Sequence, residues 1–383
     1  MPGPCELIVD LDALNRNVAL AAELAGDRTV MVAVKADAYG HGLIPVARSI
    51  EEAGSAQWLG VATVAEATAL RAAGISMPIL KFSITLRDEM VEALAARVVF
   101  TVGDTQGITD LGDAAAGAGV AADVHLKVDT GMRRIGAKPD DAVALARQIV
   151  AHDGLRLGGI YTHLPVSDTP EGGDFTRQQF RVLATAARAV VEVAGPLAFV
   201  HAANSGALLS HDLASTTMVR PGIMVYGSRP DPATPAERAP EPVDRWTSRL
   251  AFIKQIRAGE TVGYGRTWTA PRDTWIGTVA VGYGDGYSRL LSNRGRMLVD
   301  GRSVPVVGRV CMDQTMIDLG PDWPSVRVGD EVVLLGQSGD EEITVEEIAG
   351  LMGTITYEVT CLISPRVPRR YVGGAALKSK SRS

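Results

Sequence analysis

The feature that most constrains the fold of this chain is a unit that recurs between residue 29 and about residue 220. Each unit has a short run rich in β-branched residues, a polar turn, and a stretch with apolar residues at the i, i+3, i+4 and i+7 spacing of an amphipathic helix. The runs that we predict as strands are 30–34, 58–62, 77–82, 98–102, 123–128, 157–162, 197–201 and 216–220. Strands that alternate with helices form a parallel sheet, and eight such units predict an α/β fold with a (β/α)₈ barrel.

Residues 230–242 separate this region from a second one of different character. They contain five prolines and little apolar material, which is typical of a linker or an exposed loop. From 247 to 372 the chain has many short β-rich runs divided by glycine turns. One clear helix signal lies at 344–352, where Thr344 and Glu347 have the spacing of a capping box. The sequence therefore predicts a mostly β C-terminal domain after the barrel.

These patterns also predict domain boundaries. We place the barrel at 8–235 and the β-rich domain at 245–372, with residues 1–7 able to pack with the second domain. The last segment, 373–383, is basic and rich in serine, and we expect it to be a disordered tail.

Composition argues against several other classes of protein. The 383 residues carry a net charge of −6, which disfavours a nucleic-acid or acidic-membrane partner. Cys5, Cys311 and Cys361 lie far apart and form no CxxC pair, so we expect neither a disulfide framework nor a metal site. The chain shows no signal-peptide pattern, and no apolar stretch approaches the ~20 residues of a membrane span. We therefore expect a soluble, cytoplasmic protein.

Polar residues with chemical potential follow the ends of several predicted strands. They are Lys35, Lys127, His163, Asn204 with Ser205, and Arg220. Because the active sites of (β/α)₈ barrels are built at the carboxyl ends of the strands, these positions together predict an active site. Taken singly, His163 could be a core histidine, Lys127 could form a structural ion pair with Asp129 and Arg134, and Tyr264 could be a turn aromatic.

Lys35 is the strongest candidate, because it ends an apolar strand and precedes a tyrosine and two glycines. A lysine in a partly desolvated pocket has a lowered pKa and becomes a usable amine nucleophile, as a Schiff base with an aldehyde cofactor requires. The loops after the seventh and eighth strands of such barrels often bind a phosphate, and here they contain Ser205, Gly222 and Ile223. The structural alternatives are a pairing of Lys35 with Asp37 and an ordinary glycine turn.

Several segments resemble, in order, the diagnostic blocks of the alanine racemase family. They are AVKADAYGHG, HLKVDTGMRRIG, THLPVSD, HAANSG, VRPGIMVYG, VGYGRTW, VGYGDGYSR and VGRVCMDQ, and the match covers nearly the whole chain. The first resembles a pyridoxal-phosphate (PLP) attachment signature. The resemblance implies a PLP-bearing barrel, a C-terminal β domain, and a head-to-tail homodimer in which the partner's β domain completes each active site. It also implies a cytoplasmic isomerase that makes D-alanine, a peptidoglycan precursor.

The same resemblance implies roles for individual residues. Lys35 would hold the cofactor as a Schiff base and act as one catalytic base, with Tyr264 as the second. The cofactor would be surrounded by Tyr39, His163, Asn204, Ser205, Arg220, Gly222 and Ile223, with Tyr357 a weaker match near the phosphate. Arg220 would face the pyridine nitrogen, and His163 would lean on Arg220. Substrate binding, modification and the entrance are implied for Arg134 and the backbone at Met312 (substrate carboxylate), Lys127 (carbamylated), and Asp168, Tyr283, Arg289 and Arg309 (entrance).

Racemisation removes the α-proton from one face and returns a proton to the other, so it needs two acid–base groups on opposite sides of the cofactor. Tyr264 would need its pKa lowered by nearby positive charge, for which Arg220 and His163 are the available sources. An arginine cannot accept the proton of the pyridine nitrogen. The ring is then a weaker electron sink, which disfavours transamination.

Three other functions stay open. A non-catalytic PLP carrier with the same barrel would lack the β domain. A decarboxylase of the same fold would show a Gly-rich phosphate loop and a Cys-bearing acidic motif, and neither is evident. A racemase acting chiefly on serine is the closest rival. Pro365 stands where many relatives carry a tyrosine, and the smaller side chain predicts alanine as the best substrate with measurable serine racemisation.

Overall fold

The computed structural model describes residues 3–213, 215–234, 238–322 and 325–374. These fall into two compact units: the barrel unit, from Leu14 to Glu241, and the β unit, which contains the chain up to Ala13 and from Pro242 to Gly373. Of the predicted tail, residues 375–383 lie outside the described residues, as do residues 1–2 of the N-terminal segment.

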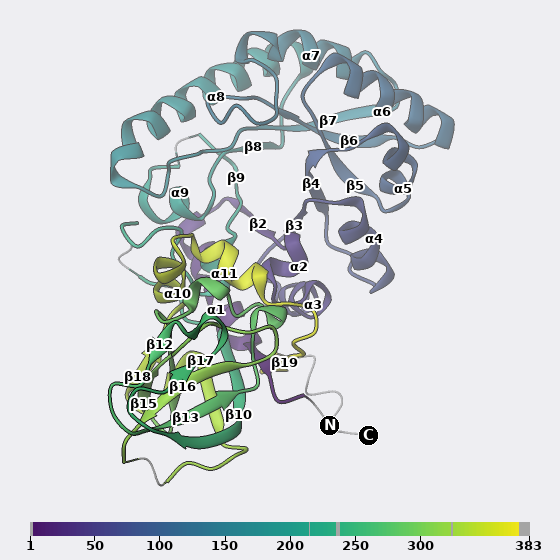
Figure 1. The fold of residues 1–383 in the computed structure, drawn as a ribbon. Helices are drawn as coiled ribbons and strands as arrows, with labels where there is room; N and C mark the ends of the chain where they lie inside the picture. Colours follow the sequence, from purple (N-terminus) through teal and green to yellow (C-terminus); the bar gives the residue numbers. More distant parts are fainter. Residues whose placement is uncertain (1–2, 214, 235–237, 323–324, 375–383) are drawn as a thin grey trace. The chain divides into compact units, whose positions relative to one another are not determined.

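The barrel unit contains a closed barrel of eight parallel strands (Figure 1). The strands are β2 (Thr29–Ala33), β3 (Trp58–Val61), β4 (Ile79–Ile84), β5 (Val98–Val102), β6 (Ala122–Lys127), β7 (Leu155–Tyr161), β8 (Phe199–His201) and β9 (Met218–Val219). The last strand closes the ring on the first, with Thr29 opposite Met218. All eight predicted strands are confirmed, and β5 is buried along its whole length, as expected for a parallel strand covered on both faces.

Amphipathic helices follow the strands along the chain. They are α3 (Leu43–Ala53), α4 (Val64–Ala72), α5 (Met90–Ala95), α6 (Thr105–Ala118), α7 (Ala142–Val150), α8 (Gly173–Ala194) and the short α9 (Ser205–Ser210), while α1 (Leu11–Ala25) precedes the barrel. α4 begins with a full capping box: the Thr63 hydroxyl accepts from Glu66 N at 3.2 Å, and the Glu66 carboxylate accepts from Thr63 N at 3.1 Å.

The β unit is built on one large, mostly antiparallel sheet (Figure 1). Its strands are β1 (Glu6–Asp10), β10 (Asp244–Ile256), β13 (Thr274–Val279), β14 (Arg296–Val299), β15 (Arg302–Pro305), β16 (Thr315–Gly320), β17 (Glu331–Ser338), β18 (Glu341–Ile343) and β19 (Arg369–Val372). The N-terminal β1 lies between β10 and β19, antiparallel to the first and parallel to the second. Tyr264 lies in the connection of a small hairpin, between β11 (Thr261–Val262) and β12 (Trp268–Thr269).

Two helices in the β unit refine the sequence interpretation. α10 (Val345–Met352) was predicted, and Thr344 Oγ1 accepts from Glu347 N at 3.1 Å. The Glu347 carboxylate, however, accepts from Arg296 Nε at 2.7 Å instead of from Thr344 N, so the predicted capping box is only half formed. α11 (Thr356–Leu362) was not predicted, because TYEVTCL is rich in β-branched and aromatic residues. No described helix is both long and apolar enough to cross a membrane.

Candidate functional site

The carboxyl ends of the barrel strands bring the predicted basic residues together. Lys35 follows β2, Lys127 ends β6 and Arg220 follows β9. Burial, followed by the charges of Arg220, Arg134 and Lys35, holds the pKa of Lys127 well below its usual value, against an opposing effect of Asp129. Positively charged groups thus converge here and outweigh the acidic ones, which favours an anionic ligand.

Arg220 is fixed at the centre of this cluster. Its side chain is buried, and burial lowers its pKa to about 10. Nη1 lies 2.9 Å from His201 Nδ1, and Nη2 donates to the carbonyls of Thr162 at 2.9 Å and Ala202 at 3.0 Å. Of its five N–H donors, Nε–H and one of the two on Nη1 have no hydrogen-bond partner among the described residues. Those donors can hold an acceptor on a ligand.

A chain of histidines extends from Arg220 into the barrel. Because arginine can only donate, His201 accepts at Nδ1 and carries its proton on Nε2, which lies 2.9 Å from His125 Nδ1. Burial and the charge of Arg220 lower the pKa of His125 to about 3 and that of His201 well below its usual value. Both rings are therefore neutral at physiological pH.

His163 differs from its predicted role in two respects. We expected it to lean on Arg220, but the histidine hydrogen-bonded to Arg220 is His201. Burial, with the charges of Arg220, Lys127 and other nearby cations, holds the pKa of His163 well below its usual value. His163 is therefore neutral and cannot be the source of positive charge that was expected of it.

The Tyr161 ring packs against Lys127 and Arg220. Its ring is fully buried and stacks on His201, with centroids 4.5 Å apart and planes 3° apart. Lys127 Nζ lies 4.1 Å from the ring centroid and the Arg220 guanidinium 5.3 Å from it. The Tyr161 hydroxyl lies 2.6 Å from Thr101 Oγ1. Both basic side chains thus lie against the same buried aromatic ring.

The residues after Lys35 form a left-handed turn (α2, Lys35–Tyr39). Four successive non-glycine residues, from Ala36 to Tyr39, have φ between 53° and 55°. A left-handed conformation costs roughly 1–2 kcal/mol per such residue. Strain of this kind persists only where the surrounding structure imposes it, and it is concentrated at functional sites.

The left-handed turn delivers Tyr39 to the loops after β8 and β9. The buried Tyr39 ring stacks on Tyr226, with centroids 4.7 Å apart. A Cβ at Gly222 would lie 2.5 Å from the Tyr39 hydroxyl, so a larger residue there would displace the Tyr39 side chain. Gly222 N donates to Ser205 Oγ at 2.9 Å, and Ile223 begins the 3-10 turn that follows. The fold therefore brings together the four residues that were predicted to lie near a phosphate, namely Tyr39, Ser205, Gly222 and Ile223.

Asn204 serves the protein's own structure. Its Oδ1 accepts from Ala207 N at 3.0 Å and from Ser167 Oγ at 2.7 Å, and its Nδ2 donates to Leu164 O at 3.2 Å. The side chain caps α9 and holds the segment that follows His163. Asp168, at the end of that segment, lies against Gly206, where a Cβ would meet its Cα at 2.9 Å.

The other predicted residues lie in the β unit. Tyr264 stands between Gly263 and Gly265, both at φ 71°, and its side chain is 73% exposed. Arg309 passes beside this turn, and its Nε is buried without a hydrogen-bond partner among the described residues. Met312 is 53% exposed. Tyr283 is also exposed, and Arg289 begins a 3-10 turn after it.

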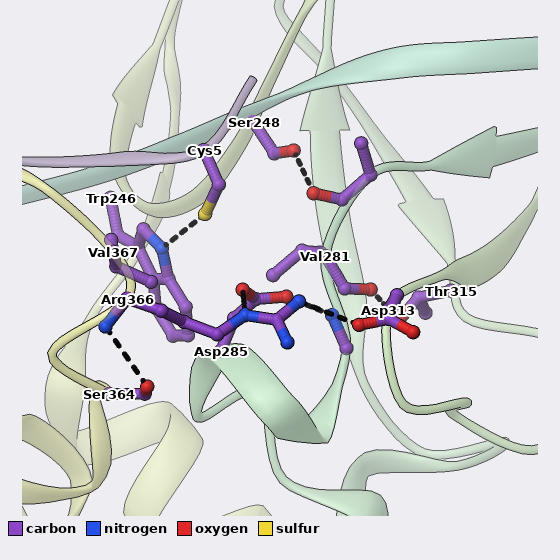
Figure 2. Close-up of polar contacts among 12 residues, drawn as sticks. Cys5, Trp246, Ser248, Val281, Asp285, Asp313, Thr315, Ser364, Arg366 and Val367 are labelled. Carbon is purple, nitrogen blue, oxygen red and sulfur yellow. Dashed lines mark hydrogen bonds and ion pairs between the residues drawn. The ribbon is translucent and has the colours of Figure 1, made fainter. Parts of the chain in front are cut away.

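Arg366 braces the loop that carries Met312 (Figure 2). Its Nε donates to Asp285 Oδ1 and its Nη2 to Asp313 Oδ1, each at 2.7 Å. The Met312 carbonyl accepts from Gly284 N at 2.9 Å. The backbone at Met312 is thereby held between two neighbouring segments.

Sequence reasoning gave no role to His201, His125 or Tyr161. Each is a polar or amphipathic side chain that directly follows a valine or isoleucine in a strand, which is a signal that could have been followed. What the sequence could not supply is their mutual contact, because the three come from different strands of the barrel.

The fold and the site together define a two-unit enzyme with a (β/α)₈ barrel, whose strand ends hold a basic, lysine-bearing site. The family model of the alanine racemase N-terminal domain matches residues 9–230, and that of the C-terminal domain matches residues 243–371. The alanine racemase of Cutibacterium acnes is 48% identical over 373 residues, which cover 97% of this chain and 99% of that protein. The chain belongs to the alanine racemase family.

Solved structures agree with this assignment. The alanine racemase of D-cycloserine-producing Streptomyces lavendulae is similar with a TM-score of 0.92 and 35% identity, covering 98% of this chain and 99% of that one. The alanine racemase of Streptomyces coelicolor A3(2) gives a TM-score of 0.91 and 37% identity, with 97% and 98% covered.

Proposed function

We propose that this chain interconverts L-alanine and D-alanine with PLP as its cofactor. The observation that carries the proposal is the convergence of Lys35, Lys127, Arg134 and Arg220 at the carboxyl end of the barrel. The family models support it, as do relatives that are alanine racemases. A racemase of serine is the alternative, and the relatives' substrate does not favour it.

The side chains at this site fit the chemistry of PLP. The excess of positive charge suits a phosphate and a substrate carboxylate. The absence of a side chain at Gly222 lets the Tyr39 hydroxyl lie close to the Gly222 backbone and to Ser205, so two hydroxyl groups stand beside backbone N–H groups, which are the kinds of group that bind a phosphate. When bound, PLP supplies an aldehyde for attachment to a lysine amine and a ring that draws electrons from the α-carbon of an amino acid. We propose that PLP is surrounded by Lys35, Tyr39, His163, Asn204, Ser205, Arg220, Gly222 and Ile223.

Two side chains would move the proton. The Lys35 amine acts on one face of the α-carbon and the Tyr264 phenol on the other, so that one removes a proton while the other returns one. Because His163 is neutral, Arg220 is the charged member of this pair, and we propose that it faces the cofactor ring. Arg220 can only donate, and its bonds to His201 and two carbonyls fix its direction.

Lys127 is proposed to be carbamylated. Burial and neighbouring cations favour its neutral amine, which is the form that attacks carbon dioxide and then loses a proton. The product is an anion whose negative charge would offset the positive charges of Arg134 and Arg220. Arg134, so oriented, would bind the substrate carboxylate together with Met312 N. Asp168, Tyr283, Arg289 and Arg309 would line the entrance.

The proposed assembly is a homodimer with shared active sites. Its support is the exposure of Tyr264 and Met312, two residues with proposed contacts to substrate. In this arrangement Tyr264 and Met312 come from the partner subunit's β unit. The enzyme would act in the cytoplasm and supply D-alanine as a peptidoglycan precursor.

Tyr264→Phe tests the two-base proposal. In heavy water, the variant should lose α-proton exchange much more for L-alanine than for D-alanine, because only the face served by Tyr264 lacks its acid–base group. Exchange is measured by nuclear magnetic resonance on each pure enantiomer. Equal losses in both directions would argue against two bases on opposite faces.

A further inference from the structure

The left-handed turn after Lys35 is held by the carboxylate of Glu66, which lies in the first turn of α4. Ala36 N donates to Glu66 Oε1 at 2.6 Å. Glu66 Oε2 accepts from Ala62 N at 2.8 Å and from Thr63 N at 3.1 Å. One carboxylate therefore joins the segment after β2 to the segment after β3, with each oxygen used by a different segment.

The bond to Ala36 N acts directly on Lys35. The peptide group that contains Ala36 N–H also contains the Lys35 carbonyl, so its orientation sets the backbone angle ψ of Lys35. That angle determines where the Lys35 side chain leaves the chain. Hydrogen bonds from backbone N–H groups to a carboxylate are stronger than those between neutral groups.

The far end of the same turn is held by other contacts. Asp37 Oδ1 accepts from Leu43 N at 2.7 Å, and the Tyr39 ring stacks on Tyr226. None of the strained residues from Ala36 to Ala38 is a glycine, which could adopt φ near 54° without this cost. Release of the Glu66 end would let the turn relax toward right-handed or extended backbone.

We propose that Glu66 is a positioning residue whose carboxylate imposes the left-handed turn and so sets the places of Lys35 and Tyr39. One consequence, that PLP binding at Lys35 depends on Glu66, rests on the proposed function, whereas the role of Glu66 in the turn does not. The opposing explanation is that Glu66 merely caps α4.

Thr63→Ala is the matched control, because it removes the hydroxyl that accepts from Glu66 N and leaves the Glu66 carboxylate in place. Glu66→Gln keeps the size of the side chain. Its amide has one acceptor oxygen, however, so its NH₂ group must face N–H donors on one of the two segments. Both variants weaken the start of α4. Only Glu66→Gln loosens the turn, because in either orientation of the amide it removes the negative charge that strengthens the bond to Ala36 N.

The experiment measures hydrogen exchange of the segment 36–43 in the full-length protein without PLP, and PLP affinity and borohydride trapping at Lys35 in the loaded protein. For Glu66→Gln we expect hydrogen exchange of this segment to be roughly tenfold faster than in the unmodified chain, because about one charge-assisted hydrogen bond is lost. We also expect PLP affinity roughly tenfold weaker and less PLP fixed to Lys35. Thr63→Ala should lower the unfolding temperature while exchange and affinity stay within about twofold.

Equal exchange of this segment in both variants would overturn the proposal. If the unmodified chain does not take up PLP at Lys35, the proposed function fails, while the exchange comparison without PLP still decides the role of Glu66. If Glu66→Gln does not fold, Glu66→Asp replaces it. Its carboxylate is one methylene too short to join both segments, so exchange of 36–43 should again be faster, and unchanged exchange would contradict the inference.

Discussion

At the scale of single residues, the charge of Arg220 in the barrel interior is surrounded by neutral groups. Arg220 lies against the Tyr161 ring, and His201 and His125 are kept neutral by burial and by the charge of Arg220. A neutral His201 can accept a hydrogen bond from Arg220 at Nδ1 and donate one from Nε2 to His125 Nδ1. The direction of Arg220 thus depends on two histidines staying unprotonated.

The stability of the barrel should therefore depend on pH through His125. In the unfolded chain the residue takes up a proton below about pH 6.5, whereas in the folded chain its pKa is about 3. The unfolded state binds more protons between these values, so stability is lost as the pH falls from about 6.5 toward 3, by up to ~1.4 kcal/mol per pH unit.

His125→Gln should reduce this slope, because glutamine accepts from His201 but does not titrate. The free energy of unfolding is measured by urea titration at several pH values from 7 to 4, in the variant and in the unmodified chain. Parallel slopes in the two proteins would show that His125 is not the group that resists protonation.

At the scale of elements, the sequence predicts what depends on periodicity and misses what depends on strain or on long-range contact. The β-branched runs identify all eight barrel strands, since burial on both faces selects such residues. The turn from Ala36 to Tyr39 was not predictable, because no local preference of these residues favours a left-handed backbone. Similarly, TYEVTCL forms α11 against its β propensity.

The site shows the same division. The strand-end positions of Lys35, Lys127 and Arg220 follow from the order of strands in a barrel. That Arg220 is hydrogen-bonded to His201 depends on side-chain directions that only the closed barrel determines.

The loop after β9 gives a prediction at this scale. In Gly222→Ala the new methyl would lie 2.5 Å from the Tyr39 hydroxyl, so Tyr39 must leave its stack on Tyr226. We expect PLP affinity, measured by fluorescence titration, to fall by roughly tenfold or more, equivalent to about 1.4 kcal/mol. Gly117→Ala is the control, because it adds a methyl in open space near the end of α6. It should leave affinity unchanged and raise stability by up to about 1 kcal/mol. Equal affinities in the two variants would remove Gly222 from the proposed phosphate site.

At the scale of the whole molecule, the proposed dimer predicts complementation. Lys35→Ala and Tyr264→Phe should each be nearly inactive. If each site takes Lys35 from one subunit and Tyr264 from the other, a mixed dimer has one intact site, and an equal mixture after subunit exchange should recover about a quarter of full activity. Verified mixed dimers without activity would show that the two residues act within one subunit.

The most direct test of the account is racemisation by the purified, PLP-loaded chain, followed by chiral chromatography. We expect L-alanine and D-alanine each to approach an equal mixture, serine to react measurably but more slowly, and Lys35→Ala to abolish both conversions. A folded, PLP-loaded protein that leaves pure L-alanine unchanged, or that racemises serine faster than alanine, would contradict the account.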